Sequence, residues 1–463
     1  MIDYNKHTRK RDAILMTHQE MYYKKMTQTP IPRLIITLGI PTTISMLITN
    51  IYNMVDTYFV GTLGESQQAA TGVLFTLQAI IQAIAFMLGQ GSGTMVSKEL
   101  ADKNQKGASK YESSAFFVGA AAGILLAVLG LVFLNPFLRI LGSTETIIPY
   151  ARQYGLCILV ACPFMICSFV LNNNLRYEGM AFYAMIGLTI GGVLNIFGDY
   201  LLIRIIPLGV LGAGISTAAS QMIGFCLLLY FHRKKAQGKI SLVHISLQKE
   251  TYFTVMRVGF PALIRQGLAS VSNGLLNNLT KPFGDAAIAA MSIVNRFSAF
   301  MMCVGLGIGQ GLQPVASFNY QAKKYARVKK ALVFTMIAGF LMVGAIAAVS
   351  LIYTKEIVLL FQKSKDVLKI AVFALRCAIV GTMFLPLSVP INMLYQSIRK
   401  AAMSTVLSLL RSGLAFIPVL LLTTKLWGIT GIQISQPLAD VITGIISIGF
   451  IIYFMFTTSN EGE

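Results

Sequence analysis

The sequence predicts an all-α membrane protein whose twelve transmembrane helices form two six-helix bundles. The 463 residues are 55% hydrophobic and only 12% charged, a composition too apolar for a soluble protein of this size. Apolar runs of roughly 20 residues or more, the length that crosses a bilayer as a helix, recur along almost the whole chain. The two halves of the sequence also resemble each other. The expected spans are 34–60, 70–96, 113–134, 150–174, 182–203, 207–231, 253–280, 286–312, 331–353, 367–394, 403–424 and 428–456.

A shift of 220 residues aligns the two halves without a gap. LGIP at 38–41 falls on VGFP at 258–261, and GQG at 89–91 falls on GQG at 309–311. Because each half holds an even number of spans, both halves enter and leave the membrane on the same side. We therefore expect a pseudo-two-fold axis along the membrane normal, a cavity at the interface between the repeats, and alternating access by rocking of the two bundles.

The spans divide the chain into five parts, and the basic residues orient them. Most lysines and arginines fall in the N-terminal tail and in the loops of one side, which predicts cytoplasmic termini in a plasma (inner) membrane protein with no cleavable signal peptide. We attribute the net charge of +20 to basic residues that orient the protein during membrane insertion and contact anionic lipids, and not to nucleic-acid binding. The parts are a tail (1–33), an N-terminal bundle (34–231), a linker (232–252), a C-terminal bundle (253–456) and a second tail (457–463).

The sequence offers little that an enzyme would need. His7, His18, His232 and His244 all fall in the tail or the linker, so we expect no membrane-embedded histidine for metal binding or for activating a nucleophile. The six cysteines lie in expected spans without a Cys-x-x-Cys pair and are expected to pack as small hydrophobic residues. No phosphate-binding loop motif is present. The protein is therefore expected to be neither an enzyme nor an ATPase, with no cofactor except a coupling ion.

Three acidic residues fall well within expected spans: Asp56, Asp199 and Asp440. An ionisable group in hydrocarbon costs several kcal/mol and usually has a function. In the 220-residue alignment, Asp56 falls on Leu276 and Asp199 falls on Val419. The repeat therefore places these two acids in the first bundle only, which favours a function over a role in the shared scaffold.

Further polar residues are expected beside the first two acids. Asn195 and Asp199 are four residues apart, on one face of a helix, and Thr217 lies near the same depth in the next span. Carboxylate, amide and hydroxyl oxygens suit Na⁺, and two carboxylates away from water equally suit a proton. The alternative is a buried hydrogen-bond network that only locks the bundle. Asp440 differs, because it shares its bundle with embedded cations and is expected to pair with one of them: Arg265, Arg296, Arg376 and Arg411.

Four motifs make the chain resemble a transporter of the multidrug and toxic compound extrusion (MATE) family, branch with an acidic first bundle. They are VDTYFVG at 55–61, LNIFGDYLLI at 194–203, GVLGAGIST at 209–217 and GQGLQP at 309–314. The resemblance covers essentially the whole span region, 34–456. It implies a twelve-helix exporter that expels lipophilic, often cationic drugs in exchange for inward H⁺ or Na⁺.

The resemblance also implies a cation-coupling site. The family's first-span Asp, fifth-span Asn and Asp, and sixth-span Thr carry over to Asp56, Asn195, Asp199 and Thr217, which would be the Na⁺ ligands of a sodium-coupled protein. Tyr154 corresponds to a fourth-span Tyr of the same network, and Asn172 is a weaker correspondence.

One departure from the family and several alternatives remain. Some members carry a Glu in the seventh span and an Asp in the tenth, but 253–280 and 371–394 contain no acid, which favours coupling through the first bundle alone. A lipid-linked saccharide flippase of the same superfamily stays open because of Arg265, Arg376 and Arg411. A channel stays open as well, and a major-facilitator carrier is disfavoured because its signature between the second and third spans is missing. We expect a monomer whose partners are drugs and membrane lipids.

Overall fold

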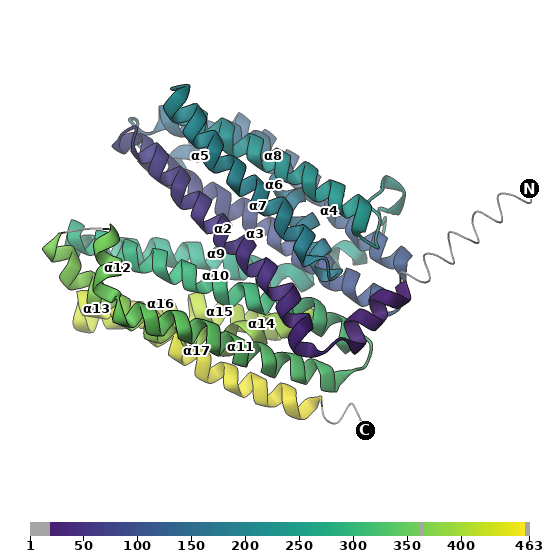
Figure 1. Cartoon of the computed structure of the whole chain (residues 1–463). Coiled ribbons are helices and arrows are strands. Elements are labelled where there is room, and N and C mark those ends of the chain that lie inside the picture. Colours follow the sequence, from purple (N-terminus) through teal and green to yellow (C-terminus); the bar gives the residue numbers. More distant parts are fainter. Residues whose placement is uncertain (1–18, 362–363, 459–463) are drawn as a thin grey trace, which may run out of the picture.

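The computed structural model describes residues 19–361 and 364–458, and these residues form helices and short connections without any strand. The expected tail positions 1–18 and 459–463 lie outside the described residues. The long helices form two groups that lie side by side (Figure 1). The first group comprises α2 (Ile31–Gly61), α3 (Glu65–Ala101), α4 (Gln105–Val132), the short α5 (Leu134–Ile140), α6 (Ile148–Tyr177), α7 (Ala181–Asp199) with η1 (Tyr200–Ile205), and α8 (Gly209–Lys235).

A connection with one short turn, η2 (Leu242–His244), leads to the second group. Several of its helices are interrupted where those of the first group are continuous. The second group comprises α9 (Lys249–Thr280), η3 (Lys281–Phe283), α10 (Asp285–Gln321), α11 (Tyr325–Ile352), α12 (Thr354–Phe361), α13 (Lys365–Thr382), α14 (Leu385–Ser397), α15 (Ala401–Leu409), η4 (Leu410–Leu414), α16 (Phe416–Trp427) and α17 (Ile429–Thr457).

The described helices account for the twelve predicted spans. Ten helical segments are long and apolar enough to cross a membrane, and α13 with α14 makes an eleventh that bends by 47°. The twelfth is α9, which is 32 residues long but carries a polar face that includes Arg265, Gln266 and Asn273. The prediction of an all-α membrane protein with two six-helix bundles is confirmed.

The bend between α13 and α14 follows from a proline. Pro386 is the second residue of α14. A proline lacks the backbone N–H and its ring clashes with the carbonyl four residues earlier, which here belongs to Thr382, the last residue of α13. In the first bundle the equivalent span, α6, runs without a break although Pro163 lies inside it.

The 220-residue repeat holds at the level of the backbone. α3 and α10 begin and end at positions 220 apart, and so do α4 and α11. Backbone conformations with positive φ repeat as well. They occur at Lys103 and Lys323 (59° and 55°) and at Gly179 and Arg399 (74° and 66°). The two halves therefore follow one chain path, and they differ in their side chains and in local breaks such as the bend between α13 and α14.

The two bundles touch closely near one end of the molecule, which we call the linker side because it carries the connection 236–248 and both described chain ends. There a Cβ added to Gly91 would lie 2.1 Å from the Val255 carbonyl oxygen, and one added to Gly259 would lie 1.9 Å from that of Met87. Only glycine permits this approach of α3 to α9. The bundles diverge toward the opposite side (Figure 1).

A short helical segment, residues 19–28, crosses the linker side and contacts both bundles. On the first bundle, the Tyr22 hydroxyl donates to the backbone oxygen of Tyr177 at 3.1 Å. On the second, the Asn319 amide donates to the backbone oxygen of Met26 at 3.1 Å. The Met26 side chain is fully buried. This segment therefore joins the two bundles at the side where they already meet.

Candidate cation site and central cavity

Four helices of the first bundle bring the predicted site residues together. Asp56 lies near the end of α2 and Tyr154 in the second turn of α6. Asn195 and Asp199 occupy the last turn of α7, and Thr217 lies in α8. All five side chains are buried, with at most 5% of their surface exposed. The structure therefore gathers residues that lie up to 161 positions apart in the sequence.

Hydrogen bonds connect four of these residues. The Tyr154 hydroxyl donates to Asp56 Oδ2 at 2.9 Å and lies 3.4 Å from Thr217 Oγ1. The Asn195 amide donates to Thr217 Oγ1 at 3.1 Å. Ser216, which the sequence interpretation did not single out, donates to the backbone oxygen of Asn195 at 2.9 Å. Asp199 lies close enough to Asp56 for the two charges to interact.

Several oxygen atoms of this cluster accept no hydrogen bond. They are Asp56 Oδ1, Asn195 Oδ1 and both carboxylate oxygens of Asp199. Buried polar atoms are nearly always paired, so four unpaired oxygens in one place require an explanation. A bound cation or a proton would satisfy them, since both interact favourably with carboxylate and amide oxygens. The cluster has the oxygen atoms of a cation site, and four of these oxygens have no hydrogen-bond donor.

The backbone changes its helical form next to this cluster. α7 ends at Asp199 and continues directly as η1, a π-helical segment over Tyr200–Ile205. π-helical turns are rare and occur frequently at functional sites. The wider turn alters the direction of the side chains that follow, so Asp199 stands at the junction of two helical geometries.

The equivalent positions of the second bundle are all apolar. Leu276, Ala374 and Ala415 belong to one hydrophobic core cluster, and Val419 and Pro437 occupy the remaining two positions. The one embedded acid of this bundle among the described residues, Asp440, is 4% exposed and pairs with Arg411 at 2.9 Å. The predicted pairing of Asp440 with an embedded arginine is confirmed.

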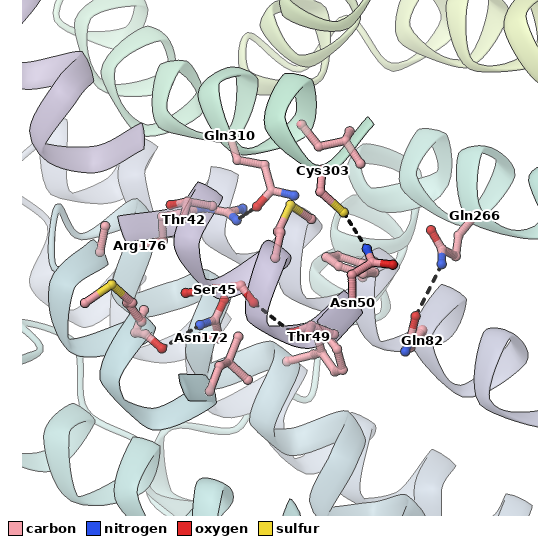
Figure 2. A pocket seen from close by; sticks show the side chains of 18 of the residues that line it. Thr42, Ser45, Thr49, Asn50, Gln82, Asn172, Arg176, Gln266, Cys303 and Gln310 are labelled. Carbon is pink, nitrogen blue, oxygen red and sulfur yellow. Dashed lines mark hydrogen bonds between the residues drawn. The ribbon is translucent and has the colours of Figure 1, made fainter. Parts of the chain in front are cut away.

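A central cavity of about 270 Å³ lies between the bundles (Figure 2). Two side-chain contacts join its walls across the bundle interface. Asn50 donates to Cys303 Sγ at 2.6 Å, and Gln266 donates to Gln82 Oε1 at 3.3 Å. Asn53 also lines the cavity and lies three residues before Asp56, on the same face of α2. The central cavity therefore reaches to within one helical turn of the candidate cation site.

Arg176 is the only charged side chain among the described residues that line this cavity. Its side chain is 2% exposed. The guanidinium donates hydrogen bonds to Gln310, to Asn173 Oδ1 at 2.6 Å and to Gln313 Oε1 at 3.2 Å. Its Nε finds no partner. Sequence interpretation missed Arg176 because it lies beyond the apolar run 150–174. The repeat could have singled out Arg176, because the aligned residue of the second half, Gln396, is uncharged.

Asn172 lies apart from the cation site. Its amide donates to the backbone oxygen of Ala184 at 3.0 Å, and its repeat counterpart Asn392 donates to Ser404 at 2.8 Å in the same way. A bond made in both bundles is part of the shared scaffold. Asn172 also lines the central cavity, so the structure places it in the cavity wall.

Two ionisable residues at the borders of expected spans are buried. His232, the first residue of the expected linker, lies in the last turn of α8 and is 1% exposed. Glu112, one residue before the expected span 113–134, lies inside α4, which begins at Gln105, and is completely buried. Both residues lie at the linker side, where helices extend beyond the apolar runs that define them in the sequence.

Two repeated helical bundles with a cavity between them and buried carboxylates in one of them define a class, the polytopic helical membrane transporters. The sequence profile of the MatE family matches residues 41–201 and again 261–422, more than half of the chain. The chain belongs to this family, as its resemblance to MATE transporters predicted. The two matches begin 220 residues apart, in agreement with the repeat.

Known relatives cover nearly the whole chain. The multidrug export protein MepA of Staphylococcus saprophyticus is 25% identical over 443 residues, which span 95% of this chain and 97% of the relative. MepA of Staphylococcus aureus is 26% identical over 430 residues, 92% of this chain and 94% of the relative.

Solved structures share the fold. A MATE protein in complex with MaL6 has a TM-score of 0.89 at 21% identity, over 94% of this chain and 98% of that one. An outward-facing multidrug resistance MATE family transporter has a TM-score of 0.88, also at 21% identity, over 94% of this chain and 98% of that one.

Proposed function

We propose that this chain is a secondary active multidrug efflux transporter that exchanges lipophilic, often cationic compounds for inward H⁺ or Na⁺. The observation that carries the proposal is the pairing of two sites. An interbundle cavity lies one helical turn from a buried carboxylate cluster, and that cluster exists in one bundle only. The names of the MepA relatives, multidrug export proteins, support the same class of substrate.

The cavity wall suits lipophilic compounds with few polar groups. Phe86, Phe169 and Met185 offer apolar surface, while Asn50 and Gln82 offer hydrogen-bonding amides. Aromatic and methionine side chains adapt to differently shaped ligands. The wall holds no carboxylate among the described lining residues, so the negative charge that attracts a cationic drug comes from Asp56 and Asp199 beyond Asn53.

Exchange follows from linkage between the two sites. A cation that binds the Asp56 cluster and a drug that binds the cavity must prefer different conformations of the two bundles. Each ligand then lowers the apparent affinity of the other by the same factor. In this structure the bundles are closed at the linker side, where Gly91 and Gly259 allow α3 and α9 to meet. If that side is cytoplasmic, as the basic loops predict, the described conformation opens outward.

Efflux measurements test the proposal. Expression in a bacterium that lacks its own pumps should reduce ethidium accumulation several-fold, and efflux should depend on an imposed Na⁺ gradient or pH gradient. Asp56→Asn serves as the matched variant, because it keeps the side-chain shape and removes the charge. Unchanged accumulation of a broad dye panel by well-expressed protein would exclude the drug exporter.

A lipid-linked saccharide flippase is the second candidate, favoured by two cations near the interface, the buried Arg176 and the half-buried Arg265. Arg176 lines the central cavity. Arg265 borders a smaller cavity of about 30 Å³ and donates to Asn392 Oδ1 at 3.1 Å and Gln90 Oε1 at 3.2 Å. Guanidinium groups suit a pyrophosphate. Transfer of a fluorescent lipid-pyrophosphate across liposomes, with no dye efflux, would select this candidate.

A further inference from the structure

Three ionisable residues meet at the linker side, far from the cation site in the sequence. Glu112 lies two turns into α4, Glu178 directly follows α6, and His232 lies in the last turn of α8. None is more than 1% exposed. One ligand atom from each residue lies within 4.8 Å of the other two. We call these residues the Glu-Glu-His cluster.

The cluster holds donor atoms without hydrogen-bond partners. Glu112 Oε2 lies 3.3 Å from His232 Nε2, but the two atoms do not complete a hydrogen bond. Glu112 Oε1 is also unpartnered. Glu178 is better satisfied, since it accepts from the backbone N–H groups of Gln237 at 2.6 Å and Gly238 at 3.2 Å. Each carboxylate oxygen has a second lone pair, so Glu178 can still bind a cation.

The connection between the bundles closes over the cluster. A Cβ added to Gly238 would lie only 2.0 Å from Glu112 Oε2, so a larger residue there would displace the Glu112 carboxylate. Two serines of α4 accept hydrogen bonds from the part of the connection that follows Gly238. The Lys239 N–H donates to Ser109 Oγ at 2.9 Å, and the Ser241 N–H donates to Ser113 Oγ at 3.1 Å. The cluster is therefore a built and enclosed site.

In the part of the chain that the structure describes, the two carboxylates of the Glu-Glu-His cluster have no lysine or arginine beside them to balance their charge. Among the described residues, no lysine or arginine forms an ion pair with Glu112 or Glu178. Two carboxylates away from water are costly to bury without compensation, typically several kcal/mol for each ion. A divalent cation balances two carboxylates and leaves a neutral imidazole as a further ligand, so the site becomes neutral as a whole.

We propose that Glu112, Glu178 and His232 bind a divalent transition-metal ion of the Zn²⁺ type. Zn²⁺ takes histidine nitrogen and carboxylate oxygen at about 2.0–2.2 Å in tetrahedral geometry. The edge of such a tetrahedron is about 3.3 Å, which matches the 3.3 Å between Glu112 Oε2 and His232 Nε2. Ca²⁺ and Mg²⁺ are disfavoured because they prefer oxygen ligands alone. The cluster offers one ligand atom from each of its three residues, which leaves the fourth position of the tetrahedron for a water molecule.

The metal has a structural role in this arrangement. It joins the ends of α4, α6 and α8, and through the hydrogen bonds of Glu178 it holds Gln237 and Gly238 on the first bundle. Because the site is closed by the connection, a metal ion bound there fixes the start of the segment that leads to α9.

Metal binding to the purified full-length chain tests the proposal. After removal of metals with a chelator, titration with Zn²⁺ should give one ion per chain by mass spectrometry and should raise the melting temperature by several degrees. Glu112→Gln and His232→Gln should each weaken Zn²⁺ binding at least 10-fold. Glu99→Gln is the matched control, because Glu99 is a nearly buried carboxylate of the same side that already pairs with Lys98 and Asn104.

Substitution with Co²⁺ supplies a measurement that needs no variant. Tetrahedral Co²⁺ with a histidine ligand should show visible absorption bands in the wild-type protein at one equivalent, and Zn²⁺ should abolish them. Absence of these bands together with absence of tight Zn²⁺ binding would overturn the proposal and leave Glu112 and Glu178 sharing protons. Equal Zn²⁺ binding by wild type, Glu112→Gln and His232→Gln would overturn it as well, by placing the ion elsewhere.

Discussion

The two bundles are built on the same backbone and differ in what they bury at equivalent positions. The first holds Asp56, Asn195 and Asp199 with unpaired oxygens, where the second holds Leu276, Ala415 and Val419. The second bundle's own acid, Asp440, is paired with Arg411 at 2.9 Å. An acid that is paired with a fixed arginine stays in that pair, whereas an acid without such a partner can bind and release a mobile ion. Under the proposed function, this difference would place coupling in the first bundle and leave the acid of the second bundle a structural role.

The largest expected effect comes from removing charge in the first bundle. Asp56→Asn or Asp199→Asn should reduce gradient-driven efflux to the background of cells without the protein, because the mobile ion loses its binding charge. Dye efflux under imposed Na⁺ and pH gradients measures this. Each variant should still fold, and dye should still bind to the purified protein. Efflux at the wild-type rate in both variants would show that the cluster only packs the bundle.

In the second bundle, removal of the buried acid should lower stability and leave coupled efflux intact. Asp440→Asn leaves Arg411 without its partner and should lower the free energy of unfolding by roughly 1–3 kcal/mol, while the surviving protein keeps its coupling. Thermal unfolding in detergent and efflux per folded molecule separate the two quantities. The double variant Arg411→Leu/Asp440→Leu should recover most of the stability. Normal stability with lost efflux in Asp440→Asn would move coupling into the second bundle.

Tyr154→Phe sharpens the comparison by removing one hydroxyl from the cation site. The hydroxyl donates to Asp56 at 2.9 Å, and hydrogen bonds to charged groups contribute about 1.5–3 kcal/mol. If protons are the coupling ion, they should therefore compete with dye about 10-fold more strongly, because the ionised carboxylate has lost a donor. If Na⁺ is the coupling ion, the change should be smaller, because Na⁺ binds the carboxylate in its ionised form. Tyr52→Phe is the control, since Tyr52 bonds Gln221 instead. No difference between the two variants would contradict the assignment of Tyr154.

The smallest effect concerns one backbone position at which the first bundle has a glycine and the second bundle has an arginine. Gly179 and Arg399 both have positive φ, which costs a non-glycine residue about 1 kcal/mol. Gly179→Ala should therefore destabilise the protein by about 1 kcal/mol. Arg399→Gly should change stability little, because the relieved strain offsets the lost bond from Arg399 to Gln321 at 2.8 Å. Chemical unfolding of the two variants checks this, and equal destabilisation of both would contradict it.

The fold was predictable because hydropathy and repetition are long-range regularities of the sequence. Even α9, which carries a polar face with Arg265, Gln266 and Asn273, was expected as the span 253–280 from its apolar run. The candidate cation site was predictable because its acids stand out against an apolar background. The Glu-Glu-His cluster was not, since Glu112 and His232 lie where helices leave the apolar zone and polar residues are expected. Only the meeting of three helix ends in space distinguishes them from ordinary surface residues.

The unpaired carboxylates of Asp56 and Asp199 have a consequence for membrane voltage. When both are ionised and empty, the first bundle carries two negative charges inside the membrane. Moving one elementary charge through 100 mV changes the free energy by about 2.3 kcal/mol. Under the proposed function, a potential that is negative on the cytoplasmic face would therefore push the empty site to face outward, where it can reload. Under the proposed function, the unpaired acids of the first bundle would make the transport cycle sensitive to membrane voltage.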